Sequence, residues 1–103
     1  MNYISYIIEK YFDTEIPQFA RLVKEVLEEM DGKNYFNLKY DYDEIYTNVK
    51  RIAKFALNDT PSYKWAMMQH YQSAEGANYK EAYEWFIEDL CDAATDIAEK
   101  DYR

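Results

Sequence analysis

Apolar residues recur at intervals of three and four along most of the chain, which is the spacing of a buried helix face. The longest such stretch spans residues 14–32 and has the apolar positions Ile16, Phe19, Ala20, Val23, Val26, Leu27 and Met30. Pro17 is tolerated in the first turn of a helix, and Gly32 is placed to end one. The pattern therefore predicts an amphipathic helix that begins near Thr14.

The same spacing predicts four more helices. Their ranges are residues 3–12, a segment from Asp41 to the turn at 58–61, then 61–72 and 79–99. Residues 33–40 show no helical period, so we expect a loop there rather than a strand. Only two glycines and two prolines occur in 103 residues, which favours long helices over many short strands. The sequence thus predicts one domain, residues 1–103, folded as an all-α bundle of four to five helices.

Side chains that can cap a helix mark three of the predicted starts. Asp41 and Glu44 have the spacing of a capping box, and Asn78 and Glu81 repeat it. The sequence NDTP at 58–61 places a threonine before a proline. These residue types favour the N-cap and the first helical position, respectively.

The predicted helix at 79–99 places like charges above one another. At about 100° per residue, a third of its circumference holds the carboxylates of Glu81, Glu84, Glu88, Asp92, Asp96 and Glu99. Trp85 falls among them, and Asp89 flanks them. The opposite side holds the expected core residues Tyr83, Phe86, Leu90, Ala93, Ala94 and Ile97.

This arrangement of charges opposes folding. Each like-charge pair four residues apart costs about 0.2–0.5 kcal/mol, and acids near a helix C-terminus also oppose the macrodipole. Two interpretations stay open: a solvated face that happens to be acidic, or an anionic face that binds a basic partner. Trp85 favours the second, because an exposed tryptophan beside charges is typical of an interface anchor. Alternatively, its ring packs against the helix at 3–12 or the loop at 33–40.

The charge balance points to the same kind of partner. The net charge is −8, and residues 75–103 contribute nine acids and three bases, a net of −6. Such a chain is repelled by nucleic acid and by anionic membrane, so we expect it to bind neither directly. The single cysteine, Cys91, fits a reducing compartment. The N-terminus does not resemble a signal peptide, and no apolar run approaches the roughly 20 residues of a membrane span. These features predict a cytoplasmic protein.

No pattern of reactive residues supports catalysis, a cofactor or a metal. His70 is the only histidine, and we expect an ordinary surface residue of its helix. Cys91 is interpreted as a small buried hydrophobe, and no glycine-rich phosphate loop is present. Lys50, Arg51 and Lys54 form one basic face, which we expect to pair with the chain's own acids or with those of a second copy.

Two stretches resemble known families of acidic binding proteins. The stretch NDTPSYKWAMMQHYQSAEG, residues 58–76, followed by an acidic closing helix, resembles the phage antirestriction DNA-mimic proteins. This resemblance implies a small helical inhibitor, often dimeric, that occupies the DNA groove of a host defence enzyme. The chain differs from that family in its 12 basic residues. The stretch TEIPQFARLVKEVLEEMDG, residues 14–32, resembles the opening of the nuclease-colicin immunity proteins, which implies a bundle that caps a basic toxin.

Together these observations predict a non-enzymatic inhibitor, phage-encoded and acting in the bacterial cytoplasm. It would bind the basic nucleic-acid-binding surface of a restriction or CRISPR effector. Glu84, Glu88, Asp92 and Asp96 would stand in for phosphates, and Trp85 would anchor the contact. The alternatives are a toxin immunity protein and a homo-oligomeric assembly protein, and a homodimer also stays open.

Overall fold

Five α-helices account for nearly all the residues described by the computed structural model, which are 3–36, 41–72 and 78–100. The helices are α1 (Tyr3–Tyr11), α2 (Pro17–Gly32), α3 (Tyr42–Asp59), α4 (Pro61–Gln72) and α5 (Tyr79–Lys100). The prediction of a small all-α bundle is confirmed. Residues 33–36 form a turn, whereas the rest of the expected loop, 37–40, lies outside the described residues.

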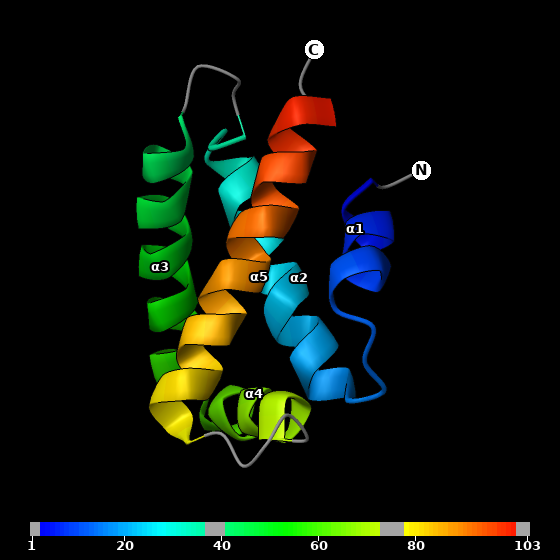
Figure 1. Ribbon diagram of the computed structural model, residues 1–103, viewed down its shortest axis with the longest axis vertical. Helices are drawn as coiled ribbons and strands as arrows, with labels where there is room; N and C mark the ends of the chain where they lie inside the picture. Colours follow the sequence, from blue (N-terminus) through cyan, green and yellow to red (C-terminus); the bar gives the residue numbers. More distant parts are fainter. Residues whose placement is uncertain (1–2, 37–40, 73–77, 101–103) are drawn as a thin grey trace.

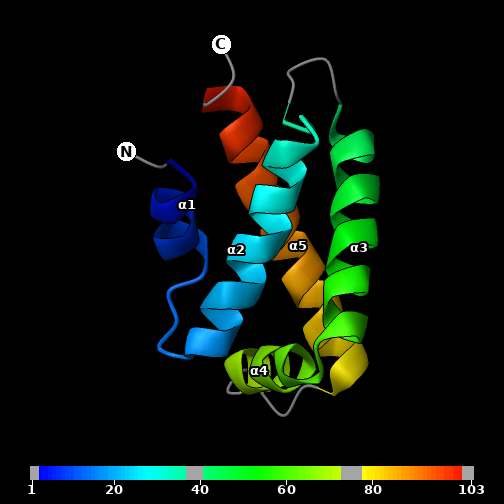
Figure 2. The same ribbon diagram turned by 180° about the vertical axis from the view of Figure 1, so that it is seen from behind.

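The longest helix, α5, occupies the centre of the bundle. It packs against α1, α3 and α4, while α2 packs against α1, α3 and α4 from the other side. In Figure 1 α5 crosses in front of α2, and in the reversed view of Figure 2 α2 lies in front. The helix α4 lies across one end of the bundle (Figure 1). This placement gives α5 contacts on several sides and leaves one strip of it open.

Local capping explains where the helices begin. The Asp41 carboxylate accepts a 2.9 Å hydrogen bond from the backbone N–H of Glu44. At the start of α5 the predicted capping box is complete: Asn78 accepts from the Glu81 N–H at 2.9 Å, and the Glu81 carboxylate accepts from the Asn78 N–H at 3.4 Å. Each bond satisfies a backbone donor that has no partner within its helix.

The helix α2 begins later than the sequence pattern predicts. Its N-cap is Ile16, which has an extended backbone with φ −95° and ψ 107°. The ring of Pro17 disfavours helical geometry in the residue before it, so the helix cannot include Ile16. Thr14 still contributes, because its hydroxyl accepts a 3.1 Å hydrogen bond from the Ile16 N–H.

A cluster of phenylalanines fills the core where α1, α2 and α5 meet. The ring of Phe19 lies 5.5 Å from that of Phe86 and 5.8 Å from that of Phe12, centroid to centroid. All three side chains are buried. Aromatic contacts of this geometry add about 0.5–1.5 kcal/mol per pair to the gain from area burial. The core therefore holds α5 rigidly and fixes the direction of its exposed strip.

Candidate functional site

The exposed strip of α5 carries a row of three carboxylates, Glu84, Glu88 and Asp92, which we call the carboxylate row. All three side chains are exposed, and none forms an ion pair within the described part of the chain. The residues are four positions apart, so successive carboxylates are separated by about 6 Å along the helix axis. This part of the predicted acidic face is therefore present as an open surface without ion pairs in the described part of the chain.

Asp96, the fourth predicted member, does not belong to this row. Its side chain is 9% exposed, because α1 covers this part of α5. Its carboxylate accepts hydrogen bonds from the Tyr3 hydroxyl at 3.0 Å, the Tyr11 hydroxyl at 2.8 Å and the Lys10 ammonium at 3.1 Å. The expectation that Asp96 replaces a phosphate is wrong, because its oxygens are used to hold α1.

These contacts also determine the ionisation of the two groups. Burial acts to raise the pKa of Asp96, but the hydrogen bonds from Tyr11, Lys10 and Tyr3 outweigh it and hold the pKa below its ordinary value. Burial together with the hydrogen bond to Asp96 raises the pKa of Tyr11 to about 12. At neutral pH Asp96 is therefore an ionised carboxylate that accepts the hydrogen bond, and the Tyr11 hydroxyl is neutral and donates it.

Asp89 is half-buried and faces α4. It accepts a 2.7 Å hydrogen bond from the hydroxyl of the buried Tyr71. Burial raises the pKa of Asp89 above its ordinary value, the bond from Tyr71 acts in the opposite direction, and the charges of Asp92 and Glu88 raise it further. Its carboxylate is therefore committed to a contact inside the bundle, and it borders the carboxylate row without extending it.

Trp85 is partly buried, and its ring lies 6.4 Å from that of Tyr71. The recorded ring contact is thus with α4, whereas the sequence suggested the helix at 3–12 or the loop at 33–40, of which residues 37–40 lie outside the described residues. Only the remaining edge of the indole can reach a partner. Among the large apolar side chains of the described residues, Phe55 and Trp65 are more open, with 74% and 53% of their surfaces exposed.

The two remaining acidic positions lie at the ends of α5. Glu81 is exposed, but its carboxylate takes part in the capping box with Asn78. Glu99 is exposed in the last turn of the helix. The structure therefore brings Glu84, Glu88 and Asp92 together as an open row, whereas Glu81, Asp89 and Asp96 are used in hydrogen bonds within the chain.

Tyrosines and lysines border the carboxylate row. A hollow of about 440 Å³ beside Glu84 and Glu88 is lined also by Tyr46, Lys50, Lys80, Tyr83 and Ile87. The Lys50 ammonium lies 5.3 Å from the centroid of the Tyr46 ring. Tyrosine is enriched in protein interfaces because it offers a large rigid surface and a polar tip. The rim of the row thus has the composition of a recognition surface.

The predicted internal pairing of the basic face is not found among the described residues. Lys50, Arg51 and Lys54 form no ion pair with acids of their own chain there. The guanidinium of Arg51 instead donates a 3.1 Å hydrogen bond to Asn48. Pairing with a second copy was the other expectation, and it stays a prediction.

Of the two groups with reactive side chains, Cys91 is buried and His70 is half-buried. Burial raises the pKa of the Cys91 thiol to about 12, so the thiol is neutral at physiological pH. His70 is not the surface residue that the sequence predicted, because its side chain is half-buried. Its ring stacks on that of Phe19 with the ring centroids 4.2 Å apart. Burial lowers the pKa of His70. Within residues 3–36, 41–72 and 78–100, no three acids, histidines or cysteines are grouped to hold a metal ion.

Neither the hydrophobicity of the helices nor similarity to known proteins assigns a function to the chain. None of the described helices has the length and apolar character needed to cross a membrane. No protein-family model, curated protein or solved structure matches the chain. A functional assignment therefore has to be argued from the geometry and charge of the chain itself.

Proposed function

We propose that the chain is a non-enzymatic inhibitor that binds the basic nucleic-acid-binding surface of a bacterial defence enzyme, either a restriction or a CRISPR effector. A phage-encoded protein acting in the host cytoplasm fits this role. The supporting observation is the carboxylate row: Glu84, Glu88 and Asp92 are exposed and have no ion-pair partner in the described chain. Lysines at alternate positions would have removed their repulsion without loss of solubility.

The row is suited to docking because it is held on a rigid support. Its helix is buried on the other sides and begins with a complete capping box. A partner would therefore lose little entropy in ordering it, which is how preorganised surfaces gain affinity. Duplex DNA carries one negative charge per about 1.7 Å of axis. The spacing of about 6 Å in the row is sparser, so it would occupy a few phosphate positions and would not imitate a whole duplex.

Reversal of two charges in the row provides the test. The variant Glu88→Lys with Asp92→Lys converts two favourable contacts into two unfavourable ones. At about 0.2–1 kcal/mol per exposed pair, the loss is about 1–4 kcal/mol, or roughly 5- to 1000-fold in Kd. The control is Glu9→Lys with Glu28→Lys, which changes the net charge equally at exposed acids of α1 and α2.

The assay is DNA cleavage by a panel of purified restriction and CRISPR nucleases, with the chain added at rising concentration. Inhibition of a panel member should weaken with salt and with the row reversal, and should persist with the control variant. Capture from a bacterial lysate on the immobilised chain should decrease when duplex DNA is added. If the row reversal inhibits as strongly as the unaltered chain, or no panel member is inhibited, the proposal is wrong.

A further inference from the structure

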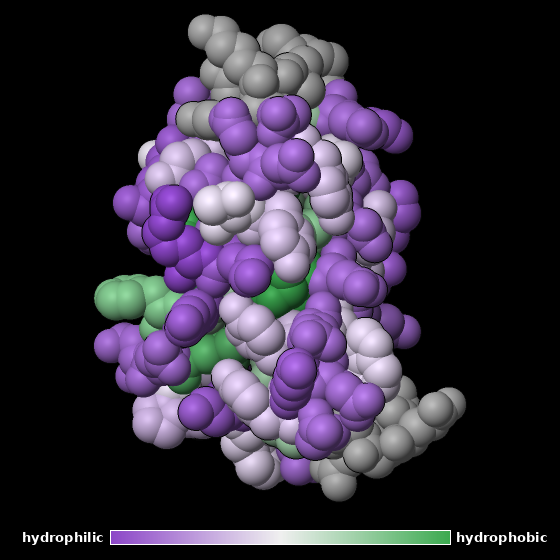
Figure 3. Space-filling model, turned by 60° about the vertical axis from the view of Figure 1, so that its left-hand side comes forward, coloured by the Kyte–Doolittle hydropathy of each residue, from purple (hydrophilic) through white to green (hydrophobic). Residues whose placement is uncertain are grey.

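Phe55 is the most exposed large apolar side chain in the described part of the chain, at 74%. It belongs to α3 and has no polar atom that could gain from contact with water. Leaving a phenylalanine in solvent forgoes about 1.5–3 kcal/mol of burial. Figure 3, in which the α3 side is turned forward, shows green hydrophobic surface between the purple residues.

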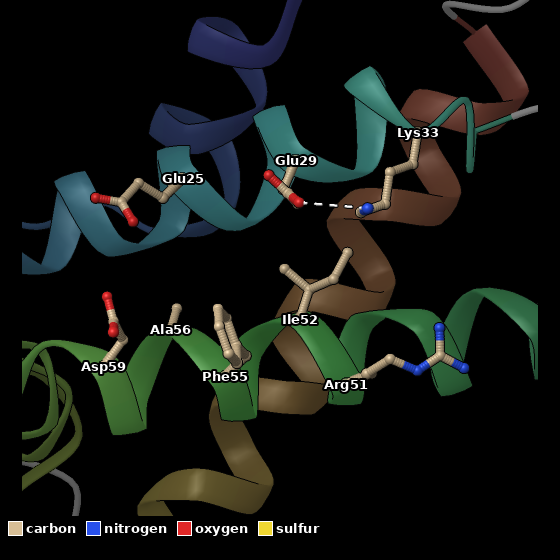
Figure 4. Close-up of a pocket in the computed structure, with 8 residues that line it drawn as sticks. All are labelled: Glu25, Glu29, Lys33, Arg51, Ile52, Phe55, Ala56 and Asp59. Carbon is tan, nitrogen blue, oxygen red and sulfur yellow. Dashed lines mark ion pairs between the residues drawn. The ribbon is translucent and has the colours of Figure 1, made fainter.

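Phe55 borders a groove between α2 and α3. The hollow has a volume of about 380 Å³ and is lined by Glu25, Glu29, Lys33, Arg51, Ile52, Phe55, Ala56 and Asp59. In Figure 4 the apolar residues Ile52, Phe55 and Ala56 come from α3 and face the charged side chains of α2. An apolar surface with a charged rim is the usual anatomy of a protein interface.

The charges along this groove are arranged with opposite signs at its two ends. On α3, Arg51 and Asp59 lie four residues before and after Phe55, so they are about 12 Å apart on one stripe. The opposite wall repeats this polarity: Lys33, which directly follows α2, lies at the Arg51 end, and Glu25 of α2 lies at the Asp59 end (Figure 4). Neither Arg51 nor Asp59 forms an ion pair within the described residues.

We infer that this groove binds a second copy of the chain about a two-fold axis that passes near Phe55. A two-fold axis perpendicular to α3 reverses the direction of that helix, so the basic end of each groove meets the acidic end of the other. Arg51 of each copy then lies opposite Asp59 of the second copy. The two Phe55 rings enter the apolar part of the facing groove, where each covers Ile52 and Ala56.

A second copy is favoured over an unrelated partner because the stripe is self-complementary. An unrelated helix would need its own apolar anchor and the opposite order of charges, whereas an antiparallel copy supplies both. One wall of the groove is steadied at its acidic end, where the hydroxyl of the buried Tyr63 donates a hydrogen bond to Glu25. At the other end of that wall, the Lys33 ammonium forms an ion pair with the Glu29 carboxylate, with 3.6 Å between nitrogen and oxygen.

Self-association through the groove is independent of the carboxylate row. The groove is lined by residues of α2 and α3 and by Lys33, whereas the carboxylate row belongs to α5 and none of its members lines the groove. A dimer would therefore present two carboxylate rows, and either inference can fail while the other stands.

Sedimentation equilibrium from micromolar to millimolar concentration tests the inference. The unaltered chain should form a dimer, and Phe55→Ala should weaken it by roughly tenfold or more, because both rings of the pair are removed. Arg51→Asp should weaken it as well, since like charges then face each other. Combining Arg51→Asp with Asp59→Arg should restore dimerisation, because the opposite charges are again paired across the axis.

Trp65→Ala is the control, since it removes an exposed aromatic side chain that lies outside the groove. It should leave the dimer unchanged, and circular dichroism should show an intact helical fold for every variant. A monomer at all concentrations overturns the inference, whatever else the groove then binds. Failure of the charge exchange to restore a dimer weakened by Arg51→Asp overturns the two-fold arrangement.

Discussion

Asp92 and Asp96 are the same residue type four positions apart on α5, yet replacing them should have very different consequences. Asp92 is exposed, whereas Asp96 accepts three side-chain hydrogen bonds from α1. We expect Asp96→Ala to destabilise the fold, because it leaves the hydroxyls of Tyr3 and Tyr11 facing a small apolar side chain. Asp92→Ala should change stability little, or raise it slightly by removing a repulsion.

The magnitude follows from the contacts of Asp96. A hydrogen bond to a charged group contributes about 1.5–3 kcal/mol. Lys10 is 46% exposed, and the bonds from Tyr3 and Tyr11 are only partly buried, so solvent weakens all three contributions. We therefore expect a total below their simple sum, about 2–4 kcal/mol, mostly from Tyr3 and Tyr11. Since each kcal/mol shifts the melting temperature by about 4–8 °C in a domain of this size, Asp96→Ala should melt at least about 8 °C lower.

Urea unfolding followed by circular dichroism measures this difference. A double-mutant cycle with Tyr11→Phe should show that the two substitutions are not additive, because they remove the same 2.8 Å hydrogen bond. Equal effects of Asp92→Ala and Asp96→Ala would refute the claim that the hydrogen bonds to Asp96 attach α1 to α5.

The pH dependence of the free energy of unfolding is a second check. The stabilisation from Asp96 is present above the ordinary pKa of 3.8 and is lost as pH falls through the lowered pKa of the folded state.

Two further predictions concern the buried reactive groups. Because the pKa of His70 is lowered from its ordinary value of 6.5 in the folded state, stability should decrease as pH falls below that value, and His70→Phe should remove this part of the pH dependence in urea unfolding. An NMR titration of this histidine with a midpoint at or above 6.5 would contradict the prediction. Because burial raises the pKa of Cys91 to about 12, a thiol reagent at about pH 8 should react with it in urea and leave the folded chain unmodified over the same time. Equal rates in both states would show that α5 opens readily.

The sequence predicted the helices well because the signals for them are local. A helical period, a capping side chain and a proline act within about four residues, which is the range of the backbone hydrogen bonds they influence. The box of Asn78 and Glu81 could therefore be identified without any knowledge of the fold. The apolar spacing predicted the start of α2 too early, because that spacing does not register the steric effect of Pro17 on Ile16.

The sequence by itself also determined that α5 has an acidic strip, since 100° per residue assigns each carboxylate an angle. It could not separate Asp96 from Asp92, because that difference depends on α1, whose Tyr11 is 85 residues away in the chain. Likewise, Trp85 and Asp89 are directed toward Tyr71 only once α4 lies across the end of the bundle. An angle on a helix limits which side chains can be exposed, but the packing of distant helices decides which of them remain in contact with water.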